Sequence, residues 1–159
     1  LEDITHAGPT LTTMALMLIG VGFSIGNVIG GRAADRSLAG TLLVFFPILG
    51  LIMLVFPFAA QSPTGALVGV LLWGIASFSL MPALQMRTMQ AAHDAPGLAS
   101  SINIGAFNLG NALGAGLGGA VLSTGSGYPM VSIAGLGISL LGVLLVLVSR
   151  MGCLSPQVE

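Results

Sequence analysis

Charged side chains are rare in this sequence, and one short group of them has the types and spacing to do chemistry. The stretch GFSIGNVIGGRAADR ends on Arg32, Asp35 and Arg36, in a chain of 159 residues with four basic and five acidic side chains. A carboxylate beside guanidinium groups can pair with neighbouring helix ends, at about 1 kcal/mol where partly buried. We expect Gly31, Arg32, Asp35 and Arg36 to form a loop that latches helix ends together. The alternative is that its arginines only fix the orientation of a membrane helix.

A second group of polar and aromatic side chains lies inside apolar runs and carries no charge. Trp73, Ser77, Met81 and Gln85 recur every four residues, which predicts one face of a helix. Amides inside a membrane are costly unless they face a partner helix or a wet cavity. We therefore expect a cavity for an amphipathic ligand, although an interfacial tryptophan with ordinary helix contacts would give the same pattern. The candidate cavity residues are Asn27, Trp73, Ser77, Gln85, Phe107, Asn108 and Asn111.

Several kinds of chemistry are excluded by what the sequence lacks. It has no HExxH or P-loop motif, so nothing indicates an enzyme. No cluster of cysteine, histidine and carboxylate is evident around the single Cys153, so we predict no metal and no cofactor. Lysine is absent and the net charge is −1, which argues against nucleic acid as a partner.

The composition requires a membrane protein. The chain is 55% hydrophobic and 6% charged, too few charges to cover a soluble globule of this length. Each apolar run is long enough to cross a bilayer as a helix. The predicted fold is an all-α polytopic bundle of five spans, at about 10–31, 38–60, 66–86, 98–122 and 129–149.

The joints between these spans alternate in charge. All four arginines fall on one side, and the joints QSPTG and STGSGY carry none. The excess of positive charge in cytoplasmic loops predicts that the arginine-bearing loops and the C-terminus face the cytoplasm, with residue 1 outside. No signal peptide precedes the first run, so we expect that preceding helices are missing.

Two spans carry glycine at every fourth residue, which makes a smooth stripe for close backbone approach. The first stripe is Gly22, Gly26 and Gly30, and the second is Gly110, Gly114 and Gly118. Asn103 lies near the second stripe on a helical wheel, so we expect it to hydrogen-bond across a helix pair. The second and fifth spans are almost wholly apolar and should face lipid, around three more polar spans.

These features together resemble the C-terminal half of a major facilitator superfamily transporter. The segment from Gly31 to Arg36 is similar to the G-x-x-x-D-R signature of that family, although Ser37, Leu38 and Ala39 follow where the family has Gly and basic residues. LIGVGFSIGNVIGGRAADR, SFSLMPALQ and NIGAFNLGNALGAGLGG resemble the sugar-efflux and drug:proton antiporter branch. The resemblance implies helices 8 to 12, with 9 and 12 peripheral. It also implies that helices 8 and 11 pack on the missing N-terminal half, which would then hold the partners of both glycine stripes.

The expected function is transport in the bacterial inner membrane, with the lipid bilayer and the N-terminal half as partners. The resemblance favours efflux of a small sugar-like or drug-like solute coupled to protons. No titratable group lies centrally in any span, so the proton carrier should lie in the missing half and this chain should not transport alone. Two alternatives remain open, namely a structural or assembly subunit and a permease subunit powered by a separate ATPase.

Overall fold

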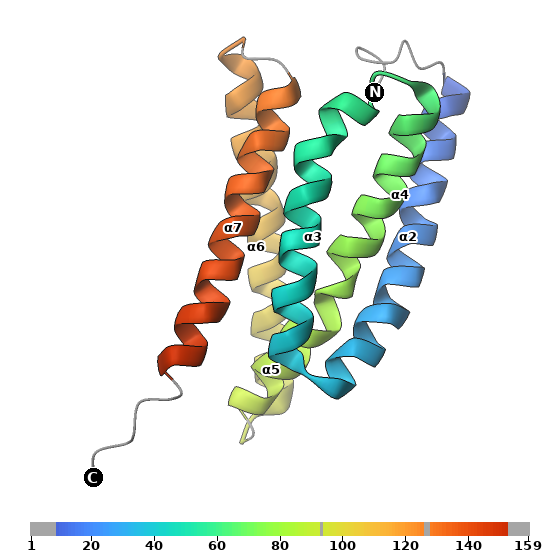
Figure 1. Ribbon diagram of the computed structural model, residues 1–159. Coiled ribbons are helices and arrows are strands. Elements are labelled where there is room, and N and C mark those ends of the chain that lie inside the picture. Colours follow the sequence, from blue (N-terminus) through green and yellow to red (C-terminus); the bar gives the residue numbers. More distant parts are fainter. Residues whose placement is uncertain (1–8, 93, 126–127, 153–159) are drawn as a thin grey trace.

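The computed structural model describes residues 9–92, 94–125 and 128–152, and the secondary structure of these residues is helical (Figure 1). The predicted fold class, an all-α bundle of membrane-spanning helices, is confirmed. The helices are α2 (Pro9–Arg36), α3 (Leu38–Ala59), α4 (Pro63–Ser79), α5 (Met81–Ala91), α6 (Pro96–Ser123) and α7 (Tyr128–Gly152).

The joint between α2 and α3 is a single residue. Helix α2 continues through Arg32, Asp35 and Arg36, so the predicted loop at these residues is wrong. Ser37 adopts an extended conformation (φ −164°, ψ 111°) and its hydroxyl accepts a hydrogen bond from the backbone N–H of Gly40 at 3.0 Å. A serine that caps the next helix in this way allows the chain to reverse without a longer loop.

The third predicted span is broken in two. Helix α4 begins after Ser62, whose hydroxyl accepts from Gly65 N at 3.1 Å, and ends at Ser79. Leu80 separates it from α5, in which Pro82 stands in the first turn. Proline has no N–H to donate to the preceding turn, and its ring clashes with that turn's carbonyl. The bend expected at Pro82 therefore appears as a break in the helix at Leu80, whose backbone keeps a right-handed helical conformation (φ −78°, ψ −28°).

Another joint follows α6. Thr124 ends the helix, and Gly125 has a positive φ of 74°, a conformation that glycine adopts without steric cost. The Gly125 N–H donates to the carbonyl of Leu122 at 3.1 Å, which satisfies one of the free carbonyl groups at the helix end.

The helices run back and forth along one direction, so their ends gather at two levels (Figure 1). The C-terminal ends of α2 and α7 lie at the same level as α5, which places all four arginines at one end of the molecule. The joint at Gln61 and Ser62 and the end of α6 lie at the opposite end. The predicted alternation of charged and uncharged joints is confirmed.

Helix α4 packs along α2, and α3 packs along α7. The interior is small and lies near the arginine end, where Ala34, Leu42, Leu80, Ala83 and Val146 are buried. Helices α3 and α7 also expose many large apolar side chains, as expected of lipid-facing helices. Four helical segments are long and apolar enough to cross a membrane, namely 10–36, 38–59, 63–91 and 129–150.

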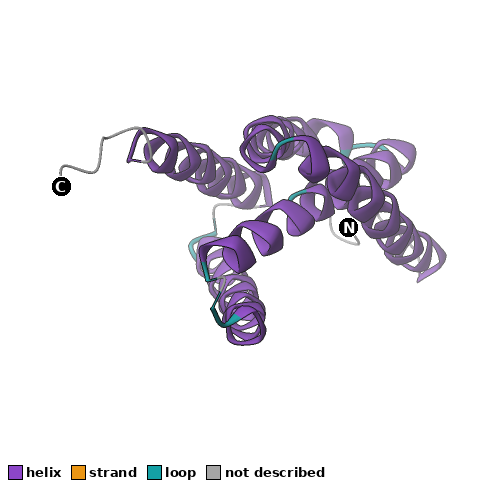
Figure 2. Ribbon diagram, turned by 90° about the horizontal axis from the view of Figure 1, so that it is seen from below, coloured by secondary structure: helices purple, strands orange, loops and turns teal. Residues whose placement is uncertain are grey.

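Helix α6 differs from the other long helices. It has 28 residues, enough to cross a bilayer. Its glycines and asparagines lower its mean hydropathy, so α6 is not one of those four apolar segments. It packs mainly on α5 and α7, and most of its residues are exposed. Seen along the helices, the structure is open, with separate arms in place of a closed ring (Figure 2). The three polar spans are thus not gathered around a common centre within this chain.

Candidate functional site

The first glycine stripe forms a very close contact between helices α2 and α4. A Cβ atom placed on Gly22, Gly26 or Gly30 would lie within 3.0 Å of a backbone carbonyl oxygen of α4. The hydroxyl of Ser79, which is fully buried, lies 3.1 Å from the carbonyl oxygen of Gly26. The stripe therefore has its partner inside the chain. The expectation that this partner belongs to a missing half is wrong.

An aromatic cluster joins the same two helices. The rings of Phe23 and Phe78 stack with centroids 3.8 Å apart, and Trp73 lies against Phe23 at 6.0 Å. The Oγ atom of Ser77 is buried and has no hydrogen-bond partner among the described residues. Sequence reasoning selected Trp73 and Ser77 but missed Phe23 and Phe78. The sequence offered only weak signals for this cluster. Phe23 lies one turn before the stripe residue Gly26, and Phe78 follows Ser77 directly.

The predicted polar face along the third span is not continuous. Trp73 and Ser77 belong to α4, whereas Met81 and Gln85 belong to α5, beyond the interruption at Leu80. The four residues therefore do not lie on one unbroken helix, and their shared face stays a prediction. Gln85 is exposed on α5, and Asn27 is exposed on α2.

The candidates on α6 form an open surface. Phe107 is 40% exposed, and Asn108 and Asn111 are also exposed. A Cβ on Gly110 or Gly114 would meet nothing within 4 Å, while one on Gly118 would lie 3.7 Å from Val131. The second glycine stripe is therefore almost unoccupied by other parts of the chain.

Asn103 makes the polar link between α5 and α6. Its amide oxygen lies 3.3 Å from Oγ1 of Thr88, which also lies 2.9 Å from the carbonyl oxygen of Leu84. A hydrogen bond between helices was the role expected of Asn103, in contrast to Asn108 and Asn111. The structure thus separates a linking asparagine from two exposed ones.

The charged residues divide into two groups. Arg32, Asp35 and Arg36 are exposed at the end of α2, and the described residues offer them no ion pair. Arg87 on α5 instead donates a hydrogen bond to the hydroxyl of Ser149 on α7. Among the described residues, no group of His, Cys, Asp and Glu could hold a metal ion.

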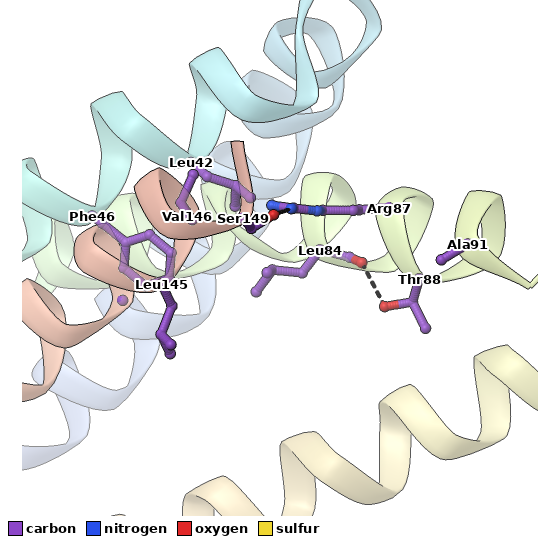
Figure 3. Close-up of a pocket in the computed structure, with 10 residues that line it drawn as sticks. Leu42, Phe46, Leu84, Arg87, Thr88, Ala91, Leu145, Val146 and Ser149 are labelled. Atoms are coloured by element: carbon purple, nitrogen blue, oxygen red, sulfur yellow. Dashed lines mark hydrogen bonds between the residues drawn. The ribbon is translucent and has the colours of Figure 1, made fainter. Parts of the chain in front are cut away.

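Among the clefts between described residues are three with volumes of about 490, 350 and 410 Å³. The largest of the three, which we name the arginine cleft, lies between α3, α5 and α7 at the arginine end (Figure 3). None of the three is lined by the predicted cavity residues, and sequence reasoning missed the arginine cleft. Its lining consists of Leu42, Phe46, Leu84, Arg87, Thr88, Ala91, Gly142, Leu145, Val146 and Ser149.

The apolar helices and the arginines at one end define a polytopic membrane protein. Comparison with known proteins makes this class more specific. Over 149 residues, 94% of the chain, it is 55% identical to the inner membrane transport protein YdhP of Escherichia coli. It is 34% identical over 127 residues, 76% of the chain, to the MFS-type transporter YtbD of Bacillus subtilis. It is 32% identical over 128 residues, 79% of the chain, to a probable sugar efflux transporter of Helicobacter pylori.

The chain therefore belongs to the MFS-type transporters, as the resemblance predicted, and is a multi-pass inner membrane protein. It spans 38% of the length of YdhP and 32% of the other two, and matches their C-terminal part. These relatives are named as transporters and not as enzymes. No family model and no solved structure matches the chain.

Proposed function

We propose that this chain forms part of a transporter that moves a small, uncharged organic solute out of the cell by alternating access. The observation that carries the proposal is the match of most of the chain to inner membrane transporters, some of them named as probable sugar efflux transporters. In transporters built from two halves, substrate binds between the halves near the middle of the membrane. A chain that supplies one half should then leave part of its binding surface open.

The exposed face of α6 fits this role. Phe107, Asn108 and Asn111 are exposed on a helix that packs only lightly on its neighbours. An amide can both donate to and accept from a hydroxyl-rich solute, and an aromatic ring can cover its apolar face. Neither group has a fixed charge that would select an ion.

Proton entry would supply the energy for efflux, and its carrier would lie outside this chain. Proton coupling needs a group that changes charge inside the membrane. The central parts of α2, α4 and α6 hold amides, hydroxyls and aromatic rings, which do not titrate near neutral pH. A gradient-driven flux therefore requires the rest of the transporter.

Reconstitution of the intact transporter in liposomes tests this proposal. We expect an imposed proton gradient to drive uptake of a radiolabelled neutral sugar or an uncharged amphipathic compound into inside-out vesicles. Asn111→Ala should lower this flux about tenfold, while the matched change Asn103→Ala should lower it much less, because Asn103 is engaged with Thr88. Residues 1–159 alone should give no gradient-driven flux. Flux by the fragment alone, or an intact protein that ignores the gradient, would contradict proton coupling by the missing half.

The arginine end of the molecule would face the cytoplasm, since positive charge is retained there. A cysteine placed at Ser62, at the opposite end, should then react with an impermeant thiol reagent in whole cells. Labelling that requires cell lysis would reverse the orientation.

Asp35 and Arg36 would act as a latch at that end, pairing with a helix end of the other half in one transport state. Both side chains are exposed and extend from the last turn of α2. Asp35→Asn should reduce transport without reducing the amount of protein in the membrane. Unchanged flux with normal insertion would leave orientation as the only role of this segment.

A further inference from the structure

We propose that the arginine cleft binds an anionic phospholipid, with the headgroup phosphate on Arg87 and an acyl chain along α3 and α7. The cleft has a volume of about 490 Å³, within the range of ligand sites in proteins, and opens between the ends of three helices. It lies apart from the exposed face of α6 that we propose for the transported solute. The inference does not depend on efflux or on proton coupling.

The charge of Arg87 is the first argument. Its guanidinium donates to the hydroxyl of Ser149, which is a neutral acceptor and cannot balance a positive charge. None of the residues that line the cleft is Asp or Glu. A guanidinium has N–H groups in a planar fork, so four donors remain after one is used, and this fork matches two oxygens of a phosphate. Among the described residues that line the cleft, nothing balances the charge of Arg87, and its guanidinium is already oriented by Ser149.

The remainder of the lining is the second argument. Beyond Arg87, the cleft continues along Phe46 of α3 and Leu145 of α7, as Figure 3 shows. Leu145 is 61% exposed, whereas Val146 beside it is 5% exposed and closes the floor. An inorganic phosphate ion would make no favourable contact with this apolar surface. An acyl chain would pack against it and cover it. The cleft therefore places one cation beside an apolar groove. This arrangement complements the anionic headgroup and the apolar acyl chain of a lipid.

The level of Arg87 in the molecule is the third argument. Arg87 lies at the end where the arginine-bearing ends of α2 and α7 gather, which is the level at which a membrane helix leaves the hydrocarbon (Figure 1). Basic pockets between membrane helices at this level are suited to anionic headgroups. A zwitterionic headgroup brings its own ammonium group close to the guanidinium. We therefore expect phosphatidylglycerol or cardiolipin to be preferred over phosphatidylethanolamine.

Lipid competition on the intact transporter tests the proposal. The detergent-purified protein is equilibrated with equal amounts of phosphatidylglycerol and phosphatidylethanolamine, and bound lipid is counted by native mass spectrometry. The wild type should retain phosphatidylglycerol at least fivefold over phosphatidylethanolamine. Arg87→Gln should abolish this preference and Arg87→Lys should keep part of it. Arg36→Gln removes the same charge at the same end but outside the cleft. It should keep the wild-type preference for phosphatidylglycerol.

Two arms make the outcome decisive. Addition of millimolar inorganic phosphate should leave the bound phosphatidylglycerol in place, and its release would assign the site to free phosphate. If Arg87→Gln does not give a monodisperse protein, the wild-type competition decides alone. Equal retention of the two lipids by the wild type would overturn the proposal, as would full retention of phosphatidylglycerol by Arg87→Gln. The second result would mean that lipid binds elsewhere or that another part of the transporter covers the cleft.

Discussion

Helices α2 and α6 carry the same pattern of three glycines four residues apart, yet the structure uses the two stripes differently. On α2, the stripe meets the backbone of α4 so closely that a Cβ atom has no room at Gly22, Gly26 or Gly30. On α6, neither Gly110 nor Gly114 has another atom of the chain where a Cβ would stand.

The difference teaches that a small-residue stripe predicts close helix packing but not the partner. Both stripes offer the same smooth surface, and only the second leaves it unoccupied in this chain. The chain spans 38% of the length of YdhP, and we propose that a helix from the remaining part packs on the second stripe. Substitutions on each stripe can therefore test whether the two stripes differ in this way.

The largest effect is expected at Gly30. Its Cβ position lies against backbone atoms of Ser79, which cannot rotate away as a side chain end could. Gly30→Leu in the intact transporter should cost about 3 kcal/mol of stability, near the upper end for overpacking, and lower the melting temperature accordingly. Gly31→Leu is the matched control, since a Cβ there meets nothing within 4 Å. Equal melting temperatures for the two variants would mean that α2 and α4 are not packed in this way.

A smaller effect is expected at Gly114, and only in the intact protein. If a helix outside this chain packs on the second stripe, Gly114→Leu should destabilise the intact transporter by about 1–2 kcal/mol. Gly116→Leu is the control, because Gly116 lies away from the stripe and also meets nothing within 4 Å. The readout is the melting temperature of detergent-purified protein. If the two variants have the same melting temperature, the second stripe faces lipid and has no helix partner.

The smallest effect is expected at Ser79. Ser79→Ala removes the hydroxyl that reaches Gly26 across the α2 and α4 interface, at 3.1 Å. The loss should be about 0.5–1.5 kcal/mol, the usual net value of one hydrogen bond. Ser24→Ala should cost less, because the exposed Ser24 hydroxyl bonds only to Gly20 within its own helix. No loss of stability in Ser79→Ala would show that the interface is held by packing alone.

Most of the fold could be predicted from the sequence because its signals are long and strong. Apolar runs of about 20 residues leave few alternatives to membrane helices, and the positions of four arginines relate the joints to one another. Local chemistry at the joints was harder to read. The segment from Arg32 to Arg36 was expected to be a loop because it is charged, but it contains no glycine or proline after Gly31, and Ser37 alone suffices to end one helix and cap the next.

Much less of the candidate site could be predicted. Helical spacing placed Trp73 and Gln85 on one face, but that spacing holds only while the helix is continuous, and α4 and α5 are separated at Leu80. Arg87 and Ser149 are 62 residues apart in sequence, and no local pattern connects them. The roles of Asn108 and Asn111 depend on a surface that this chain leaves open, so they stay predictions.

The one-residue joint at Ser37 has a consequence for how the protein is made. Helices α2 and α3 leave the ribosome in succession and are expected to enter the bilayer as a hairpin, because a single linking residue cannot separate their ends by more than about 7 Å. The partner of the α2 stripe does not yet exist at that moment, since Ser79 follows Gly26 by 53 residues. The interface between α2 and α4 can therefore form only after α4 has been made, and the glycine face of α2 must wait for it.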